Sequence, residues 1–216
     1  MPPAIAWLLG IVAVLFIIVT IASRRKERER TEALRRVAET AGLAFEPEAD
    51  LAAVRSLGDV QLFARGHSRR VTNLMTGRAG GEQIAVFDYR FTIGSGKSQH
   101  TTVQTVVVLP AAKRGLPDLQ MAPENPVSRL AEAFGYQDID IESSPEFSSR
   151  YIVRGADEEA IRAALYPRAT SYFAEHEGWT VEVQSGTVAV YRADRRAKPD
   201  DMQAFIAAGC AAAQNL

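Results

Sequence analysis

The sequence predicts an α+β protein, with an N-terminal transmembrane helix followed by an antiparallel-sheet domain with flanking helices and a C-terminal amphipathic helix. Three observations predict this class. Residues 4–22 contain no charged side chain. Residues 59–110 alternate between apolar and polar side chains and are divided by glycine turns. The expected helices stand at the ends of blocks of strands, which distinguishes α+β from doubly wound α/β proteins.

The apolar run AIAWLLGIVAVLFIIVTIA, residues 4–22, has the length of a membrane-spanning helix. Its 19 residues would span roughly 28 Å, close to the ~30 Å of a bilayer's hydrocarbon core. The run has no polar face, and Trp7 lies near one end, where an indole would sit among lipid headgroups. A cleaved signal peptide is the alternative, but no Lys or Arg precedes the run and no A-x-A site follows it. We therefore expect residues 1–23 to be a transmembrane anchor, with the lipid bilayer as the partner of residues 4–22.

A basic segment follows the anchor at residues 24–34. Five of the seven residues from Arg24 to Arg30 are basic, which by the positive-inside rule places the following domain on the cytoplasmic side. We expect a single-pass protein of the inner (cytoplasmic) membrane. The residues expected at the anchor's interface are Trp7, Arg24, Arg25 and Lys26. Setting the topology is sufficient to explain the cluster, although anionic headgroups would also attract it.

The first half of the domain is expected to hold a helix and then a meander of strands. Residues 27–42 should continue the helix from the membrane, with Leu34, Val37, Ala38 and Ala41 on one face and Gly42 as the stop. Glycine turns should separate antiparallel strands. These strands are expected near 60–64, 71–75, 84–93 and 101–109. Prolines 110, 117, 123 and 126 indicate an irregular connection.

The second half is expected to combine short helices with short strands. Asp157 should cap one helix, Pro167 should interrupt it, and Ser185-Gly186 should form a hairpin turn. The helices are expected at 126–134, at 158–165 with a restart to 175, and from 199 to the end. The strands are expected at 137–142, 149–154, 179–184 and 187–192.

Composition indicates one globular domain over residues 35–216, because 47% of residues are apolar and 24% are charged. A division into two halves, 35–116 and 117–216, stays open. Residues 51–116 contain nine basic and three acidic side chains, whereas residues 117–216 contain nine basic and sixteen acidic ones. Opposite charge would favour docking of the halves. A local similarity between residues 35–43 and 129–136 leaves a duplication open as well.

The segment Gly94-Ser95-Gly96-Lys97-Ser98 resembles part of a phosphate-binding loop but lacks what the chemistry needs. The motif G-x-x-x-x-G-K-[ST] requires a glycine where Phe91 stands, and a following helix whose amides hold the phosphate. The residues that follow predict a strand. We therefore interpret the segment as a hairpin tip with a solvated Lys97.

No metal-binding pattern is found either, and no cofactor is expected. Asp138, Asp140 and Glu142 alternate as on the solvated face of a strand, without the turning backbone of a calcium loop. The three histidines (His67, His100 and His176) have no ligand spacing, and the single cysteine, Cys210, is expected to be a packed core thiol.

Two further features of the sheet region have a structural interpretation. Asp88 interrupts an apolar run, so we expect a carboxylate paired with Arg90 or a neighbouring strand in preference to a general base. Aromatic residues lie mostly at spacing two, which favours a buried face over a base-stacking platform. These aromatic residues are Phe63, Phe87, Tyr89 and Phe91. No nucleic-acid partner is expected.

Several short patterns together resemble a known type of protein. They are Asn73-x-x-x-Gly77, Val86-Phe87-Asp88-Tyr89, Gly94–Lys97 leading to Gln104, and Phe147-x-x-x-Tyr151-x-Val153-x-Gly155. The chain is similar over roughly 35–216 to a loose group of uncharacterised bacterial single-span membrane proteins with a domain of unknown function. The resemblance implies no activity and no catalytic residues.

The sequence therefore favours a membrane-tethered, non-enzymatic interaction or scaffold module, whose partner is another membrane or membrane-proximal protein. Two alternatives stay open: a lipid- or nucleic-acid-binding domain that uses the basic residues 51–116, and an enzyme with an unrecognised site. A deep pocket with convergent polar groups would favour the enzyme, and an exposed apolar patch would favour the module.

Overall fold

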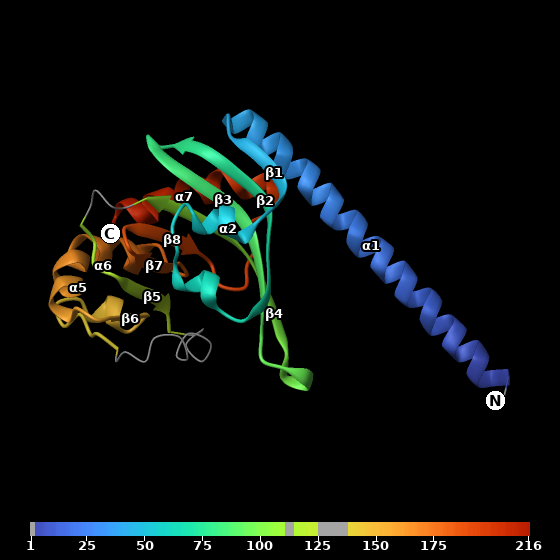
Figure 1. The fold of residues 1–216 in the computed structure, drawn as a ribbon. Coiled ribbons are helices and arrows are strands. Elements are labelled where there is room, and N and C mark those ends of the chain that lie inside the picture. Colours follow the sequence, from blue (N-terminus) through green and yellow to red (C-terminus); the bar gives the residue numbers. More distant parts are fainter. Residues whose placement is uncertain (1–2, 111–114, 125–137) are drawn as a thin grey trace.

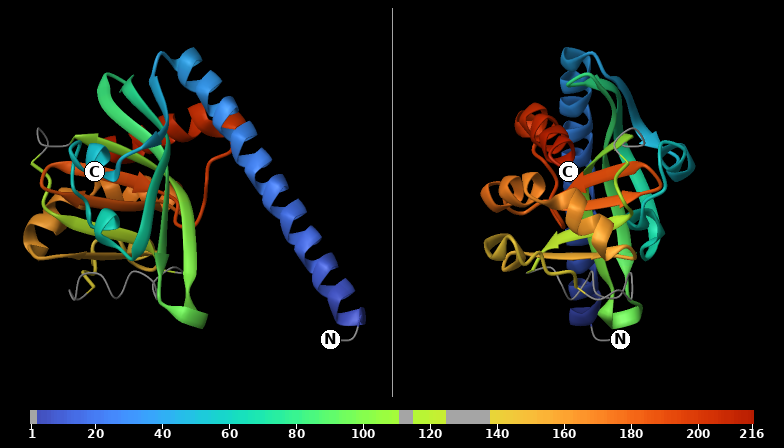
Figure 2. Two further views of the ribbon diagram at one scale, coloured as in Figure 1. Left: turned by 45° about the vertical axis from the view of Figure 1, so that its right-hand side comes forward. Right: turned by 90° about the vertical axis from the view of Figure 1, so that its left-hand side faces the viewer.

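A single antiparallel sheet organises the computed structural model, which describes residues 3–110, 115–124 and 138–216, with side chains from Ile11 onward. In these residues eight strands are joined in the order β1-β2-β3-β4-β8-β7-β5-β6. Helices α1, α4, α5, α6 and α7 pack against one face, and the short α2 and η1 cover part of the other. Figures 1 and 2 show the two layers on either side of the sheet. The predicted combination of helices with an antiparallel sheet is confirmed.

The strands are of unequal length, and the longest ones belong to the first half of the chain. They are β1 (Ala44–Ala49), β2 (His67–Ala79), β3 (Glu82–Ile93), β4 (His100–Pro110), β5 (Leu119–Pro123), β6 (Tyr151–Gly155), β7 (Thr180–Gln184) and β8 (Thr187–Tyr191). The described helices are α1 (Pro3–Ala41), α2 (Leu51–Arg55), η1 (Gln61–Ala64), η2 (Gly96–Ser98), α4 (Pro145–Ser148), α5 (Glu158–Leu165), α6 (Arg168–Glu175), η4 (Pro199–Asp201) and α7 (Met202–Gln214).

The predicted meander of the first half is confirmed for three of its four expected strands. Strands β2, β3 and β4 pair with their neighbours in sequence, and β3 and β4 stay in register from Ala85↔Val108 to Ile93↔His100. Strand β8 then pairs with β4 from Val106↔Tyr191 to Pro110↔Thr187. Strands from both halves of the chain therefore share one sheet.

Helix α1 is continuous over 39 residues and ends where the sequence predicted. Gly42 adopts φ +68°, a left-handed conformation that glycine takes without steric cost, and its N–H donates to the Glu39 carbonyl at 3.2 Å. On the predicted face Leu34 and Ala38 are fully buried, whereas Ala41 is exposed. The second half of α1 thus packs on the sheet through a short apolar stripe.

The strand expected at 60–64 is wrong, because this segment forms the 3₁₀ turn η1. Its backbone makes the i→i+3 hydrogen bonds of such a turn, from the Phe63 N–H to the Val60 carbonyl at 3.0 Å and from the Arg65 N–H to the Leu62 carbonyl at 3.3 Å. Leu62 and Phe63 within the turn are both fully buried. The turn is stabilised by a buried carboxylate, since the Leu62 N–H donates to Glu182 Oε2 at 2.7 Å. This partner lies far away in sequence, so the local alternation could not reveal it.

Two expectations around the proline-rich connection are also wrong. Leu119–Pro123, expected to be irregular, forms β5 and pairs with both β6 and β7. The described part of the expected strand 137–142 is a loop, held to β6 because Asp138 Oδ1 accepts the Val153 N–H at 2.9 Å. The carboxylates of Asp138, Asp140 and Glu142 therefore do not share a strand face. Residue 137, the helix expected at 126–134 and the similarity at 129–136 lie outside the described residues.

The remaining local expectations of the second half are confirmed. Asp157 caps α5 by accepting the Ala160 N–H at 3.0 Å, and α6 begins directly after Pro167. Strands β7 and β8 form the expected hairpin around Ser185-Gly186. The closing helix α7 buries its apolar face, and Cys210 lies in the core as a thiol that is 5% exposed.

Candidate functional site

Residues 11–21 of α1 carry an exposed apolar surface. Its large apolar side chains from residue 11 onward are 55–73% exposed, and Phe16 is the most exposed of them. They are Ile11, Val12, Val14, Leu15, Phe16, Ile17, Ile18, Val19 and Ile21. Figures 1 and 2 show this half of the helix projecting away from the domain. An exposed apolar surface of this extent is typical of a segment that contacts a membrane or another protein.

Among the described residues, no helix reaches the length and apolarity needed to cross a membrane. The side chains of residues 4–10, and with them the predicted interfacial Trp7, lie outside those that the structure describes.

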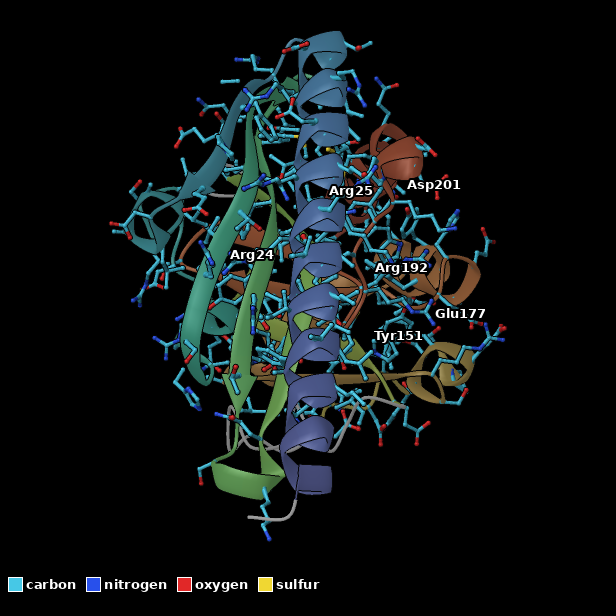
Figure 3. The ribbon with its side chains drawn as sticks, turned by 90° about the vertical axis from the view of Figure 1, so that its right-hand side faces the viewer. Arg24, Arg25, Tyr151, Glu177, Arg192 and Asp201 are labelled. Atoms are coloured by element: carbon cyan, nitrogen blue, oxygen red, sulfur yellow. The ribbon has the colours of Figure 1, made fainter. Side chains whose placement is uncertain are left out.

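The predicted basic interface lies directly after the apolar surface. Arg24, Arg25 and Lys26 are all exposed, and Arg25 Nε donates to Glu29 Oε1 at 2.8 Å. Figure 3 shows Arg24 and Arg25 beside α1, above the first half of the helix. Arg24, Arg25 and Lys26 are therefore accessible to a binding partner.

Arg30 belongs to the same basic cluster by sequence but has a different environment. Its guanidinium binds Asp88 through two hydrogen bonds, Nε to Oδ2 at 2.8 Å and Nη2 to Oδ1 at 2.9 Å. The two side chains are 11% and 0% exposed. Asn73 and Thr105, on the neighbouring strands β2 and β4, donate to the same carboxylate at 3.0 and 2.8 Å. The prediction that Asp88 is a bonded carboxylate is confirmed. Of the two expected kinds of partner, the neighbouring strands are correct and Arg90 is wrong, because Arg30 forms the ion pair.

The segment between β8 and η4 completes this junction between α1 and the sheet. Thr105 Oγ1 accepts the Ala197 N–H at 2.9 Å, and the Thr105 N–H donates to the Arg195 carbonyl at 3.0 Å. Arg196 forms a bidentate pair with Glu27 of α1 at 2.8 and 2.9 Å. These bonded residues are called the α1 junction; they are Glu27, Arg30, Asn73, Asp88, Thr105, Arg195, Arg196 and Ala197. The junction holds the second half of α1 to the domain.

A cavity of about 470 Å³ lies on the other face of the sheet, beneath the α2–η1 segment. Apolar and polar side chains both line it. The apolar ones are Val60, Ala64, Phe91, Ile93, Tyr191 and Ala193, and the polar ones include Arg65, Thr102, Gln104, Thr180, Gln184 and Asp194. Its volume falls within the range of small-molecule sites. We call it the η1 cavity.

Four residues that line the η1 cavity hold buried polar atoms without a hydrogen-bond partner in the described part of the chain. These atoms are Arg65 Nε, Gln104 Nε2, Thr180 Oγ1 and Gln184 Oε1. The orientation of the Gln104 amide follows from its neighbour, because the Asp194 N–H can only donate and does so to Gln104 Oε1 at 3.2 Å. Buried polar groups are rarely left unbonded, so this concentration favours a binding role for the cavity.

A fully bonded carboxylate, Glu182, lies beside the cavity. In addition to the Leu62 N–H, it accepts from Arg65 Nη2 at 2.8 Å, Gln120 Nε2 at 3.1 Å and the Tyr191 hydroxyl at 2.7 Å. Burial, and then the nearby Glu182 charge, raises the pKa of Tyr191 well above its usual value. Tyr191 therefore remains a hydrogen-bond donor at neutral pH.

The other segments singled out by sequence have structural roles. The Gly94–Ser98 segment is an exposed hairpin tip that leads into strand β4, as predicted, and it holds only the three-residue 3₁₀ turn η2 in place of the longer helix that a phosphate-binding loop requires. The aromatic residues form a core cluster, in which the Phe63 and Tyr89 rings meet edge to face at 5.5 Å. The described residues contain no group of three or more His, Cys, Asp or Glu side chains placed to hold a metal ion.

Sequence reasoning missed the η1 cavity entirely. Gln104, Thr180 and Gln184 are neutral residues in or beside strands and carry no local signal. Glu182 did carry one, since a carboxylate between Val181 and Val183 interrupts an apolar strand in the same way as Asp88. That pattern indicates a bonded carboxylate but does not identify the elements that it joins.

A comparison of the sequence with family models finds no match, and neither does a comparison with curated proteins. Among solved structures, the chain is similar to the crystal structure of the mycobacterial trehalose monomycolate transport factor A, TtfA. The TM-score is 0.56 at 12% sequence identity, and the match covers 88% of this chain and 92% of that chain. At this identity the similarity concerns the fold alone.

Proposed function

We propose that the chain is a membrane-tethered, non-enzymatic domain, held at the bilayer surface by α1, that interacts there with another membrane or membrane-proximal protein. The observation that carries the proposal is the difference between the two halves of α1. In the first half, the described side chains from Ile11 to Ile21 expose apolar groups on all sides, whereas the second half is bonded to the domain at the α1 junction. Tethering would raise the local concentration of residues 35–216 near such a partner.

The anchor is tested with two charges placed in the exposed apolar surface. Each Arg near the centre of a membrane helix costs about 2.5–3.5 kcal/mol, so Leu15→Arg combined with Ile18→Arg should release the chain from membranes. The full chain is expressed in bacteria, and the membranes are extracted with alkaline carbonate. The wild type should stay in the pellet and the double variant should appear in the supernatant.

The matched control is Leu57→Arg, which charges a side chain that is 45% exposed but lies on the domain. It should stay in the pellet with the wild type. Extraction of the wild type, or retention of the double variant, would contradict the proposed anchor.

We also propose that the domain lies on the cytoplasmic side, because the Arg24–Arg30 cluster follows the apolar run. A fluorescent protein fused after Leu216 should fluoresce, and alkaline phosphatase fused at the same position should be inactive. The opposite pair of results would contradict this orientation.

A lipid-related role is a second candidate, and a specific observation favours it. The η1 cavity combines apolar walls with four residues whose buried polar atoms have no described partner, as expected for a site that accepts an amphipathic molecule. The protein of similar fold, TtfA, is a transport factor for trehalose monomycolate. Both observations support a domain that handles a lipid or part of one next to the bilayer.

This second candidate is tested by mass spectrometry of molecules that copurify with the full chain in detergent. Ala193→Phe would fill part of the η1 cavity and should lower the amount of a copurifying lipid. Ala53→Phe, on the exposed surface of α2, is the control and should leave it unchanged. Equal amounts in both variants would contradict a lipid site in this cavity.

A further inference from the structure

The β3–β4 hairpin extends beyond strand β8 on its β4 side. Strand β8 pairs with β4 only from Val106 to Pro110. On the other side β2 follows β3 up to Thr92, and the His67 ring lies 3.1 Å from the Gly94 carbonyl, so there only the tip passes the neighbouring strand. The tip, residues 94–100, is exposed throughout. In Figures 1 and 2 the tip and the N-terminal end of α1 lie on the same side of the molecule, at the bottom of each view. The hairpin therefore extends in the direction in which α1 leaves the domain.

The two elements start from a common point, because Asp88 of β3 is bonded to Arg30 of α1. From Asp88 to Gly94, six strand residues span ~20 Å. From Arg30 back to Ala22, the end of the apolar run, eight helical residues span ~12 Å. The hairpin is inclined to the helix (Figure 1), but it is long enough to bring its tip level with the end of the apolar run.

The distance between the domain and a bilayer around residues 4–22 would be short. The Glu27–Arg196 pair is the first described ion pair that joins α1 to the domain. It follows Ala22 by five residues, or ~7.5 Å of helix. The headgroup region adds roughly 5–7 Å on each side of the hydrocarbon core. An element that extends past this pair toward the N-terminus of α1 would therefore enter the headgroup layer.

The hairpin's own charge suits a surface of anionic lipid. The sequence has no acidic residue from 89 to 117, and Lys97 lies at the tip. One carboxylate from another segment, Asp194, lies 3.8 Å from His100 Nε2, where the tip enters β4. Lys97 is exposed and forms no ion pair with the described residues. A basic side chain near an anionic membrane surface is attracted to it, whereas a carboxylate would be repelled.

We propose that the tip of the β3–β4 hairpin, residues 94–100, is a second membrane contact that docks Lys97 on anionic lipid headgroups and fixes the orientation of the domain on the bilayer. The inference rests on the proposed function, since it requires α1 to hold the chain in the bilayer. The contact is made by a headgroup surface, without a pocket for one lipid molecule.

The test uses the full chain in vesicles of phosphatidylcholine, with and without phosphatidylglycerol. In a Cys210→Ala background, an environment-sensitive fluorophore is attached at Ser95→Cys on the tip. The matched control is Gln83→Cys, an exposed position at the other end of the same strand β3. With anionic lipid, fluorescence at 95 should shift to shorter wavelength and be quenched by spin-labelled headgroups, whereas fluorescence at 83 should do neither.

The variant Lys97→Gln removes one charge and should lower the ratio of contacting to free tips about fivefold in anionic vesicles at low salt. Flotation of the same vesicles separates the two proposals. If the chain floats and positions 83 and 95 behave alike, the hairpin contact is wrong and the anchor stands. If the chain does not float, the anchor is wrong and the hairpin contact is overturned with it.

Discussion

Asp88 and Glu182 are both buried carboxylates in the middle of apolar strands, but they lie on opposite faces of the sheet. Asp88 joins α1 to the sheet and accepts from Arg30, Asn73 and Thr105; of these, Asn73 has an Oδ1 without a partner among the described residues. Glu182 joins η1 to the sheet and adjoins a cavity in which neighbouring polar atoms have no described partner. A buried carboxylate by itself therefore indicates attachment of an element, and the concentration of unbonded groups around a cavity distinguishes a candidate binding site.

The largest expected effect is at Asp88. Removing one partner of a buried ion pair leaves the other charge uncompensated, so Asp88→Ala should lower the free energy of unfolding by about 3–5 kcal/mol. Denaturant unfolding of the full chain in detergent measures it. Arg90→Ala, at an exposed position two residues away, should change stability by no more than ~0.5 kcal/mol. Equal effects would show that Asp88 is not the attachment point of α1.

The two buried tyrosines of the cavity face provide a closer comparison. Tyr191→Phe removes a hydrogen bond to the Glu182 carboxylate and should cost about 1.5–3 kcal/mol. The Tyr89 hydroxyl has no described partner, so Tyr89→Phe should change the free energy of unfolding by about 1 kcal/mol or less, in either direction. Thermal unfolding of the two variants checks the difference. A costly Tyr89→Phe would reveal an unrecognised partner on this face.

High pH should destabilise the same face. Burial raises the pKa of Tyr89 to about 12, compared with 10.0 in its absence. Burial favours the neutral form of Tyr89 in the folded state. The contribution of neutral Tyr89 to the free energy of unfolding is therefore fully present below pH 10 and is lost as the pH rises from 10 to 12. The loss amounts to about 2–3 kcal/mol. Stability measured against pH should fall less steeply in Tyr89→Phe, and identical slopes would contradict the assignment.

The smallest expected effect concerns the exposed part of the α1 junction. Glu27 and Arg196 are partly solvated, so Glu27→Gln should cost only about 0.2–1 kcal/mol, and less at high salt. The free energy of unfolding of both variants is measured at low and high salt. The loss in Glu27→Gln should shrink as salt is added, whereas the loss in Asp88→Ala should persist. A large, salt-resistant effect of Glu27→Gln would mean that α1 is held mainly by this outer pair.

Local signals were sufficient for most elements of the fold. Alternation predicted the β2–β3–β4 meander, and capping and turn residues such as Asp157, Gly42 and Gly186 located helix ends and a hairpin. The failures occur where a distant contact decides. Leu62 lies in a strand-like pattern but forms a 3₁₀ turn, because its N–H is bonded to the distant Glu182. Leu119–Pro123 is a strand because it pairs with β6 on one side and with β7 on the other.

The sequence was sufficient to predict the α+β class, the order of most elements, the apolar run at the N-terminus and the bonded character of Asp88. These features follow from periodicity and from neighbouring residues, which can be read along one chain. The folded structure was needed to show that Arg30 is the partner of Asp88, that Glu182 holds η1, and that Gln104 and Thr180 meet at one cavity. Those contacts join residues between 58 and 120 positions apart or on different strands, and such pairings arise from packing of the whole sheet instead of from local pattern.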